Sequence, residues 1–474
     1  MKKEELFEIL GGIDEAEVEK AGQYAAKKQA VRIRWGILAA CAAVILLAVF
    51  GIPALRNARK GSGGVLIVKA AYPEGVAAGM DAQEFAESEE HWNWWKGYRD
   101  KVGQTAALYN DMEEYDRAVM KEILTGDDNT VCSPLNTYIA LAMLAEASDG
   151  NTQAQVLHLL DVPDLATLRA KVSAMWENNC VDTPILTSRL SNSLWLSKTM
   201  KYNEDTLNCL AETYYASSFR GTPGSDEMNE ALRSWTDENT GGLLKEYTKD
   251  MRVNKDLVMD IVSTIYYKAE WLNSFSPELT AAETFHGTKG DTEVRMMHLT
   301  DMAEVYRTDK FTALSMNLYD SGAMYFYLPQ EGTDVESLLS DPDLFKAAVF
   351  DENDPNRSVP MVNISIPKFR VSAKTDLKDV LARLGVTDAL DPMLSDFSPL
   401  TSDRDDIYLA KADHAAMVEI DEYGVTGAAY TELELDGAGA ALEIMDFTLD
   451  RPFLFLLTGK DGSVLFSGIV RNID

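Results

Sequence analysis

Apolar and acidic residues alternate near the C-terminal end of the chain, as expected for a half-buried β-strand. Between residues 416 and 421, Ala416, Val418 and Ile420 would lie on one face and the acidic side chains on the other. The same period resumes after Gly424. One face of this second stretch is small or apolar throughout: Val425, Gly427, Ala429, Thr431, Leu433 and Leu435. Two antiparallel strands joined by a glycine turn explain the pattern, and so does a strand followed by a segment that can enter a sheet.

Earlier in the chain, helical and strand patterns alternate. Pro134 stands just inside the start of an apolar helical pattern, LNTYIALAMLAEA, and Gly150 follows its end. The runs MYFYLP (324–329) and VNISIP (362–367) are aromatic or β-branched and end in proline, which marks the end of a strand. A helical first third followed by strand-rich parts predicts the α+β fold class.

Several blocks in the same order and spacing resemble those of the serpin family, from about Met112 to the end. They are NTVCSPLNTYIALAMLAEASDGNTQAQVL (129–157), LRSWTDENTGGLLKEY (232–247), IVSTIYYKAEWLNSF (261–275), SIPKF (365–369) and RPFLFLLTGKDGSVLFSGIV (451–470). The resemblance implies a serpin domain over residues 105–474, with three β-sheets, about nine helices and an exposed reactive-centre loop.

The resemblance also assigns roles to residues around the loop. The hinge at its base would comprise Glu422, Gly424, Val425, Gly427, Ala428 and Ala429, and the inserting face would continue with Thr431, Leu433 and Leu435. The sheet-opening site would comprise Ser133, Ser263, His414, Trp271 and Lys368, with an ion pair between Glu422 and Lys368. Three positions depart from the family. Serpins usually have asparagine at 263, threonine or serine at 425 and a small residue at 430, where this chain has Ser263, Val425 and Tyr430.

A serpin offers its loop to a protease, becomes acyl-linked to it and traps it by inserting the loop into the main sheet. Seventeen residues counted from Glu422 place the cleaved bond at Ala438–Gly439, whereas counting back from Arg451 gives Ala441–Leu442. Both acyl residues are small, so the resemblance implies an elastase-like or subtilisin-like serine protease as target. The alternative is a non-inhibitory serpin that acts as a cell-surface binding or structural module.

The N-terminal part of the chain carries a second signal. Residues 35–55 form an uncharged stretch of 21 residues bounded by Arg34 and Arg56, long enough to cross a bilayer as a helix. The preceding 34 residues mix acidic and basic side chains, unlike the basic start of a cleaved signal peptide, which is the competing interpretation. We expect an N-terminal cytoplasmic tail (1–34), a transmembrane helix (35–55), a linker (56–104) and a serpin domain outside the cell membrane.

Composition narrows the function further. The net charge of −32 argues against nucleic-acid binding. The five histidines are scattered, and no HExxH, G-x-S-x-G, P-loop or CxxC motif occurs, so we expect neither an enzyme nor a cofactor or metal. The four cysteines show no ligand-like spacing; free thiols are favoured over a Cys180–Cys209 disulfide. The expected partners are a target serine protease and, through residues 35–55, the membrane, with the chain acting as a monomer.

Overall fold

The computed structural model describes residues 64–425 and 444–473, except residues 74, 110, 350 and 405. The candidate transmembrane segment, and the loop residues after Val425 up to 443, lie outside the described residues. Within the described part, no helix is both long and apolar enough to cross a membrane. The described residues, from residue 64 onward, belong to one compact unit.

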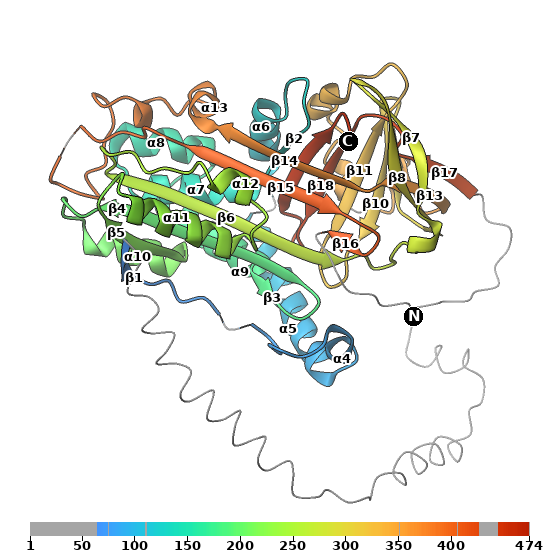
Figure 1. Cartoon of the computed structure of the whole chain (residues 1–474), viewed down its shortest axis with the longest axis horizontal. Helices are drawn as coiled ribbons and strands as arrows, with labels where there is room; N and C mark the ends of the chain where they lie inside the picture. Colours follow the sequence, from blue (N-terminus) through green and yellow to red (C-terminus); the bar gives the residue numbers. More distant parts are fainter. Residues whose placement is uncertain are drawn as a thin grey trace, which may run out of the picture. The chain divides into compact units, whose positions relative to one another are not determined.

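Three β-sheets carry the fold, as expected from the sequence (Figure 1). The large sheet has the order β1-β5-β4-β6-β16-β15-β14, with β3 paired to β4. Its strands are β1 (Gly64–Val68), β3 (Val181–Asp182), β4 (Thr187–Ser197), β5 (Ala216–Gly221), β6 (Met259–Glu270), β14 (Phe369–Asp376), β15 (Asp413–Ile420) and β16 (Gly424–Val425).

The second sheet has the order β12-β9-β10-β11-β18-β19-β2, and the third has the order β17-β13-β8-β7. The strands of the second are β2 (Thr130–Cys132), β9 (Val305–Arg307), β10 (Phe311–Asn317), β11 (Ala323–Pro329), β12 (Arg357–Ser358), β18 (Phe453–Thr458) and β19 (Val464–Val470). Those of the third are β7 (Ala281–Gly287), β8 (Gly290–Met302), β13 (Met361–Pro367) and β17 (Ile444–Thr448).

Ten α-helices surround these sheets in the described residues, close to the nine expected. They are α4 (Ala82–Ala86), α5 (Glu89–Thr105), α6 (Glu113–Ile123), α7 (Pro134–Glu146), α8 (Gly150–Leu159), α9 (Leu165–Asn179), α10 (Glu204–Thr213), α11 (Asp226–Asn239), α12 (Lys245–Thr248) and α13 (Leu377–Arg383). The apolar α7 is almost wholly buried, and the Ser133 side chain caps its first turn, as the Ser-Pro pattern predicts.

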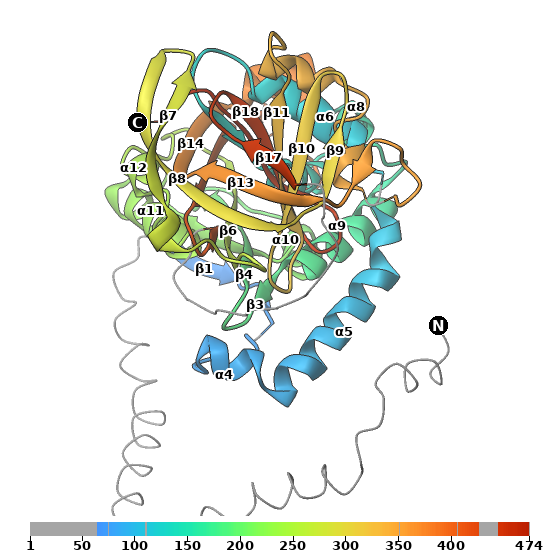
Figure 2. The ribbon, with the colours of Figure 1, turned by 90° about the vertical axis from the view of Figure 1, so that its right-hand side faces the viewer.

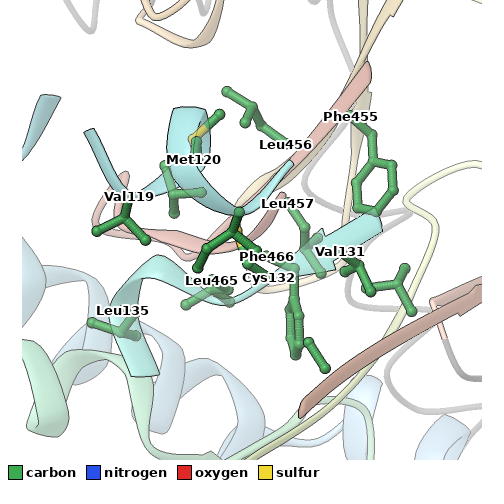
Figure 3. Close-up of a cluster of buried hydrophobic side chains, with 14 of the residues drawn as sticks. Val119, Met120, Val131, Cys132, Leu135, Phe455, Leu456, Leu457, Leu465 and Phe466 are labelled. Atoms are coloured by element: carbon green, nitrogen blue, oxygen red, sulfur yellow. The ribbon is translucent and has the colours of Figure 1, made fainter. Parts of the chain in front are cut away.

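The core forms where helices and the second sheet meet. Figure 3 shows one cluster of it, in which α6, β2, α7, β18 and β19 contribute side chains that are almost fully buried. They include Val119, Met120, Val131, Leu135, Phe455, Leu457 and Phe466. Cys132 also lies in this cluster, and Cys132, Cys180 and Cys209 are all free thiols.

Residues 64–104, which the sequence pattern suggests are a linker, form secondary structure on the body. Strand β1 extends the large sheet by pairing antiparallel with β5, because its run GVLIV has the composition of a strand. In the short helix α4, Phe85 is fully buried, and at the start of α5 His91 Nε2 lies 2.6 Å from Asp320 Oδ2. Figure 2 shows α4 and α5 at one side of the molecule. We call residues 64–105 the N-terminal extension.

Candidate functional site: the loop-entry region of the large sheet

Strands β6 and β15 are the neighbours between which a loop would enter the large sheet. The short strand β16 stands between them and is antiparallel to both: Val425 pairs with Ala269 of β6 and with Ile420 of β15. Beyond these positions, the described residues contain no pairing between β6 and β15 (Figure 1). We call the region between residues 259–268 of β6 and 413–419 of β15 the slot, since the described residues place no other strand between them there.

Two residues of the predicted hinge already occupy the mouth of the slot. Val425 is 2% exposed, which places the first residue of the predicted inserting face on the buried side of the sheet. Gly424 is required at its position, because a Cβ there would overlap the carbonyl oxygen of Ala269. The carboxylate of Asp421 accepts hydrogen bonds from the backbone N–H groups of Tyr423 and Gly424, which fixes the tight turn before β16.

Trp271 follows the end of β6 and lies under this turn. Its indole Nε1 donates to the Asp421 carbonyl at 2.9 Å, and its backbone N–H donates to the Tyr423 carbonyl at 2.9 Å. Phe275 N–H donates in the same way to the Glu422 carbonyl. The backbone that leads into the loop is therefore held by the segment that follows β6, which is the placement expected for Trp271.

The predicted ion pair between Glu422 and Lys368 is present at the mouth. Lys368 Nζ lies 2.5 Å from Glu422 Oε2, and Thr280 Oγ1 donates to Glu422 Oε1 at 2.9 Å. The side chain of Glu422 is 8% exposed and that of Lys368 is 38% exposed. Burial raises the pKa of Glu422, but the hydrogen bonds from Lys368 and Thr280 outweigh burial and hold this pKa below its usual range. No sequence pattern pointed to Thr280.

His414 and Ser133 meet in the middle of the large sheet. Backbone N–H of Ser133 donates to His414 Nε2 at 3.0 Å, so the start of α7 is tied to β15. His414 is 5% exposed, and burial lowers its pKa to about 4. The imidazole is therefore neutral at pH 7, as its acceptor role requires.

Ser263 lies on β6 and has other partners than those the sequence suggested. Its hydroxyl lies 2.7 Å from Asn192 Oδ1 on β4 and also contacts Asn136 Oδ1 on α7, while Asn136 Nδ2 donates to the Ser263 carbonyl at 3.0 Å. The polar groups thus form two sets: His414 with Ser133, and Ser263 with the two asparagines. A serine side chain is too short to span to β15, so α7 connects the strands on the two sides of the slot.

The remaining predicted site residues lie outside the described residues. These are the hinge residues Gly427, Ala428 and Ala429, the inserting-face residues Thr431, Leu433 and Leu435, and the candidate bonds Ala438–Gly439 and Ala441–Leu442. In the described part of the chain no cluster of His, Cys, Asp and Glu has the arrangement of a metal site.

The sheet order and the loop-entry geometry define the class of this protein, and sequence comparison agrees. The sequence model of one family, described as Serpin (serine protease inhibitor), matches residues 114–473. The chain belongs to the serpin family. Serpins are in general inhibitors rather than enzymes, although some of them do not inhibit.

Individual relatives cover most of the chain. It is 28% identical to an uncharacterized serpin-like protein of Thermococcus kodakarensis over 78% of this chain and 87% of the relative. It is 27% identical to mouse neuroserpin over 73% of this chain and 86% of the relative. Among solved structures, native tengpin, a thermophilic serpin, superposes with a TM-score of 0.69 at 20% identity, covering 86% of this chain and all of tengpin. That structural likeness shows the fold.

Proposed function

We propose that this serpin is a suicide-substrate inhibitor of serine proteases that prefer small residues. One observation carries the proposal: Val425 already lies buried between β6 and β15, at the mouth of the slot, where the described residues place no other strand between these two strands. A segment that has begun to pair in this register needs no new type of contact to continue.

The length of the slot matches the predicted inserting face. If the pairing of Val425 with Ala269 continues one residue at a time, Leu435 reaches the position opposite Met259, the first residue of β6. Every second residue from Val425 to Leu435 would then face the core, and none of these residues carries a charge. Tyr430, a departure from the family pattern, falls on the opposite face, and Val425, the other departure in the loop, is already accommodated.

The chemistry begins with an ordinary attack by the protease. Its serine oxygen bonds to the carbonyl carbon of Ala438 or Ala441, the peptide bond breaks, and the new amino group of Gly439 or Leu442 takes a proton and leaves. Insertion of about fourteen residues, at ~3.3 Å each, then carries the acyl-linked protease roughly 46 Å before water can hydrolyse the ester. This displacement distorts the catalytic site of the protease.

The candidate acyl residues restrict the target. Alanine fits a narrow, apolar specificity pocket, so elastase-like and subtilisin-like proteases are favoured over trypsin-like ones, which need a basic residue. The proposal also keeps the expected location: residues 35–55 anchor the chain in the cell membrane, with the serpin domain outside and acting as a monomer.

The test mixes the full chain, in detergent micelles, with pancreatic elastase and with subtilisin. We expect a denaturant-stable adduct on gels and release of a C-terminal peptide that begins at Gly439 or Leu442. Two neighbouring alanines give a matched pair of variants. Ala429→Arg places a charge on the inserting face and should abolish the adduct, whereas Ala428→Arg places it on the other face and should retain the adduct.

Complete cleavage without adduct, by both proteases, would contradict inhibition. The chain would then be a non-inhibitory serpin, and a binding or structural role at the cell surface would replace the proposal. An adduct that forms equally well with both arginine variants would contradict the assigned face of insertion.

A further inference from the structure

A cavity of about 910 Å³ lies between the N-terminal extension and the body of the serpin domain. This volume is in the range of small-molecule sites in proteins. One wall comes from residues 71–73, Val76 and the middle of α5, and the other comes from α9, β3, β4, Tyr215 and the end of α11. The cavity exists only because the extension folds back on the body, and it is separate from the slot.

Aromatic rings dominate the walls. Five of them line the cavity: Tyr72, Trp94, Tyr98, Trp176 and Tyr215. Trp176 and Tyr215 are stacked with ring centroids 3.5 Å apart, and Trp94 and Tyr98 are stacked at 5.3 Å. One stacked pair therefore belongs to the body and the other to the extension.

The polar atoms of these rings are mostly used elsewhere. Tyr72 OH donates to the Tyr215 carbonyl at 2.9 Å, Tyr98 OH donates to the Asn178 carbonyl at 2.9 Å, and Trp176 Nε1 donates to the Leu190 carbonyl at 3.2 Å. Since these donors are occupied, the rings offer a ligand mainly apolar surface. Aromatic faces are electron-rich and attract cations as well as other rings.

Charged side chains at the cavity have an excess of carboxylates. Lys101 is paired with Glu177 at 2.8 Å, and Arg189 is paired with Asp182 at 3.2 Å. The fifth charged residue of the lining, Glu238, is exposed near the end of α11 and forms no ion pair with the other described residues. The two cations are thus already neutralised, whereas one carboxylate is left to recognise a positive ligand.

We propose that this cavity binds a small planar aromatic molecule that carries a positive charge, such as an aryl-alkyl ammonium compound. The ring packs among the aromatic side chains of the walls, and the ammonium group meets Glu238. The net charge of −32 of the chain raises the local concentration of such cations further.

Three indoles that carry a positive, a neutral and a negative side chain test the ligand class. The full chain in detergent micelles is titrated by calorimetry with tryptamine, a cation, with tryptophol, which is neutral, and with indole-3-acetate, an anion. Each titration is corrected with a protein-free micelle blank. We expect tryptamine to bind about fivefold more tightly than tryptophol, and indole-3-acetate to bind most weakly.

Two glycines of α5 supply a matched pair of variants for the location. Gly97 lines the cavity and Gly103 does not, and a Cβ at either position would meet no atom within 4 Å. Gly97→Leu places a bulky side chain in the cavity and should weaken tryptamine binding about tenfold, whereas Gly103→Leu should leave it unchanged. Leucine favours a helix over glycine at both sites, so neither change should unfold α5.

A second pair of variants on α11 tests the charge. Glu238→Gln should remove the advantage of tryptamine over tryptophol, while Glu230→Gln, on the same helix but away from the cavity, should preserve it. The proposal is overturned if tryptamine does not bind, if the three indoles bind alike, or if the Gly97 and Gly103 variants bind tryptamine equally well.

Discussion

The mouth and the middle of the large sheet hold the slot by different means. At the mouth, Glu422 and Lys368 form an ion pair in which the lysine is 38% exposed. In the middle, His414 is 5% exposed and neutral, and it accepts a hydrogen bond from the start of α7. An ion pair whose lysine is partly exposed is screened by salt and contributes little, whereas a buried neutral acceptor is costly to remove or to protonate.

The difference indicates that the two regions do different things along the path of the loop: the mouth sets the register, and the middle resists opening of the sheet. At the mouth, backbone contacts hold the first two loop residues in register. The ion pair between Glu422 and Lys368 helps to set that register but adds little to stability. The middle ties β15 and β6 to the same helix end, so opening the sheet there disturbs buried hydrogen bonds of α7. The resistance to insertion should therefore be greatest around His414 and smallest around Lys368.

Protonation of His414 in acid should lower the free energy of unfolding by more than any change at the mouth does. Burial lowers the pKa of His414 to about 4 in the folded protein, against about 6.5 in the unfolded chain. The unfolded state then binds a proton first, so the stabilisation is complete above pH 6.5 and is lost as the pH falls toward 4. The loss in unfolding free energy amounts to about 3 kcal/mol.

Urea unfolding at a series of pH values measures this effect by comparison with a variant. His414→Gln keeps an acceptor for the Ser133 N–H but does not titrate, so its stability should fall less between pH 6.5 and 4. His298→Gln, a change of the same type at a half-exposed histidine on β8, should follow the wild-type curve. Parallel curves for the wild type and the His414 variant would show that protonation of His414 does not limit stability.

Loss of the turn glycine should have the next largest effect. Gly424→Ala places a methyl group against the carbonyl oxygen of Ala269, which is backbone and cannot move aside. Overpacking of this kind costs about 1–3 kcal/mol, and expulsion of β16 relieves it. We expect faster amide exchange at Trp271 and Phe275, whose N–H groups bond to Tyr423 and Glu422. Gly97→Ala, where the added Cβ meets open space, is the control and should not alter exchange. Unchanged protection in the Gly424 variant would mean that the sheet accommodates the methyl group without expelling β16.

The sequence predicted the mouth of the slot better than its middle. The alternation after Gly424 identified the buried face correctly at Val425, and the family pattern identified the pairing of Glu422 with Lys368. The partners of Ser263 were missed. Asn136 and Asn192 come from α7 and β4, far away in sequence, and only the packing of α7 under the sheet brings them to β6.

In the N-terminal extension, too, the local sequence pattern does not predict the long-range partner. Its first strand is a short apolar run beside a glycine-rich stretch, and nothing in that run indicates which sheet edge it joins. The pairing of β1 with β5 depends on an edge that exists only once the large sheet has formed.

The ion pair at the mouth should give the smallest effect, and salt should reveal its origin. Lys368→Met leaves Glu422 buried with only Thr280 as side-chain partner, and we expect a loss of about 1 kcal/mol that shrinks in high salt. The lowered pKa of Glu422 means that its contribution to stability is present above the pKa of this carboxyl in the unfolded chain and is lost as the pH falls through its pKa in the folded protein.

Arg370→Met is the matched control. Arg370 is 54% exposed and 4.0 Å from Glu419, so its removal should change stability hardly at all. The contrast would be contradicted if the Lys368 variant lost as much unfolding free energy as protonation of His414 costs, at every salt concentration. The mouth would then contribute as much to stability as the middle.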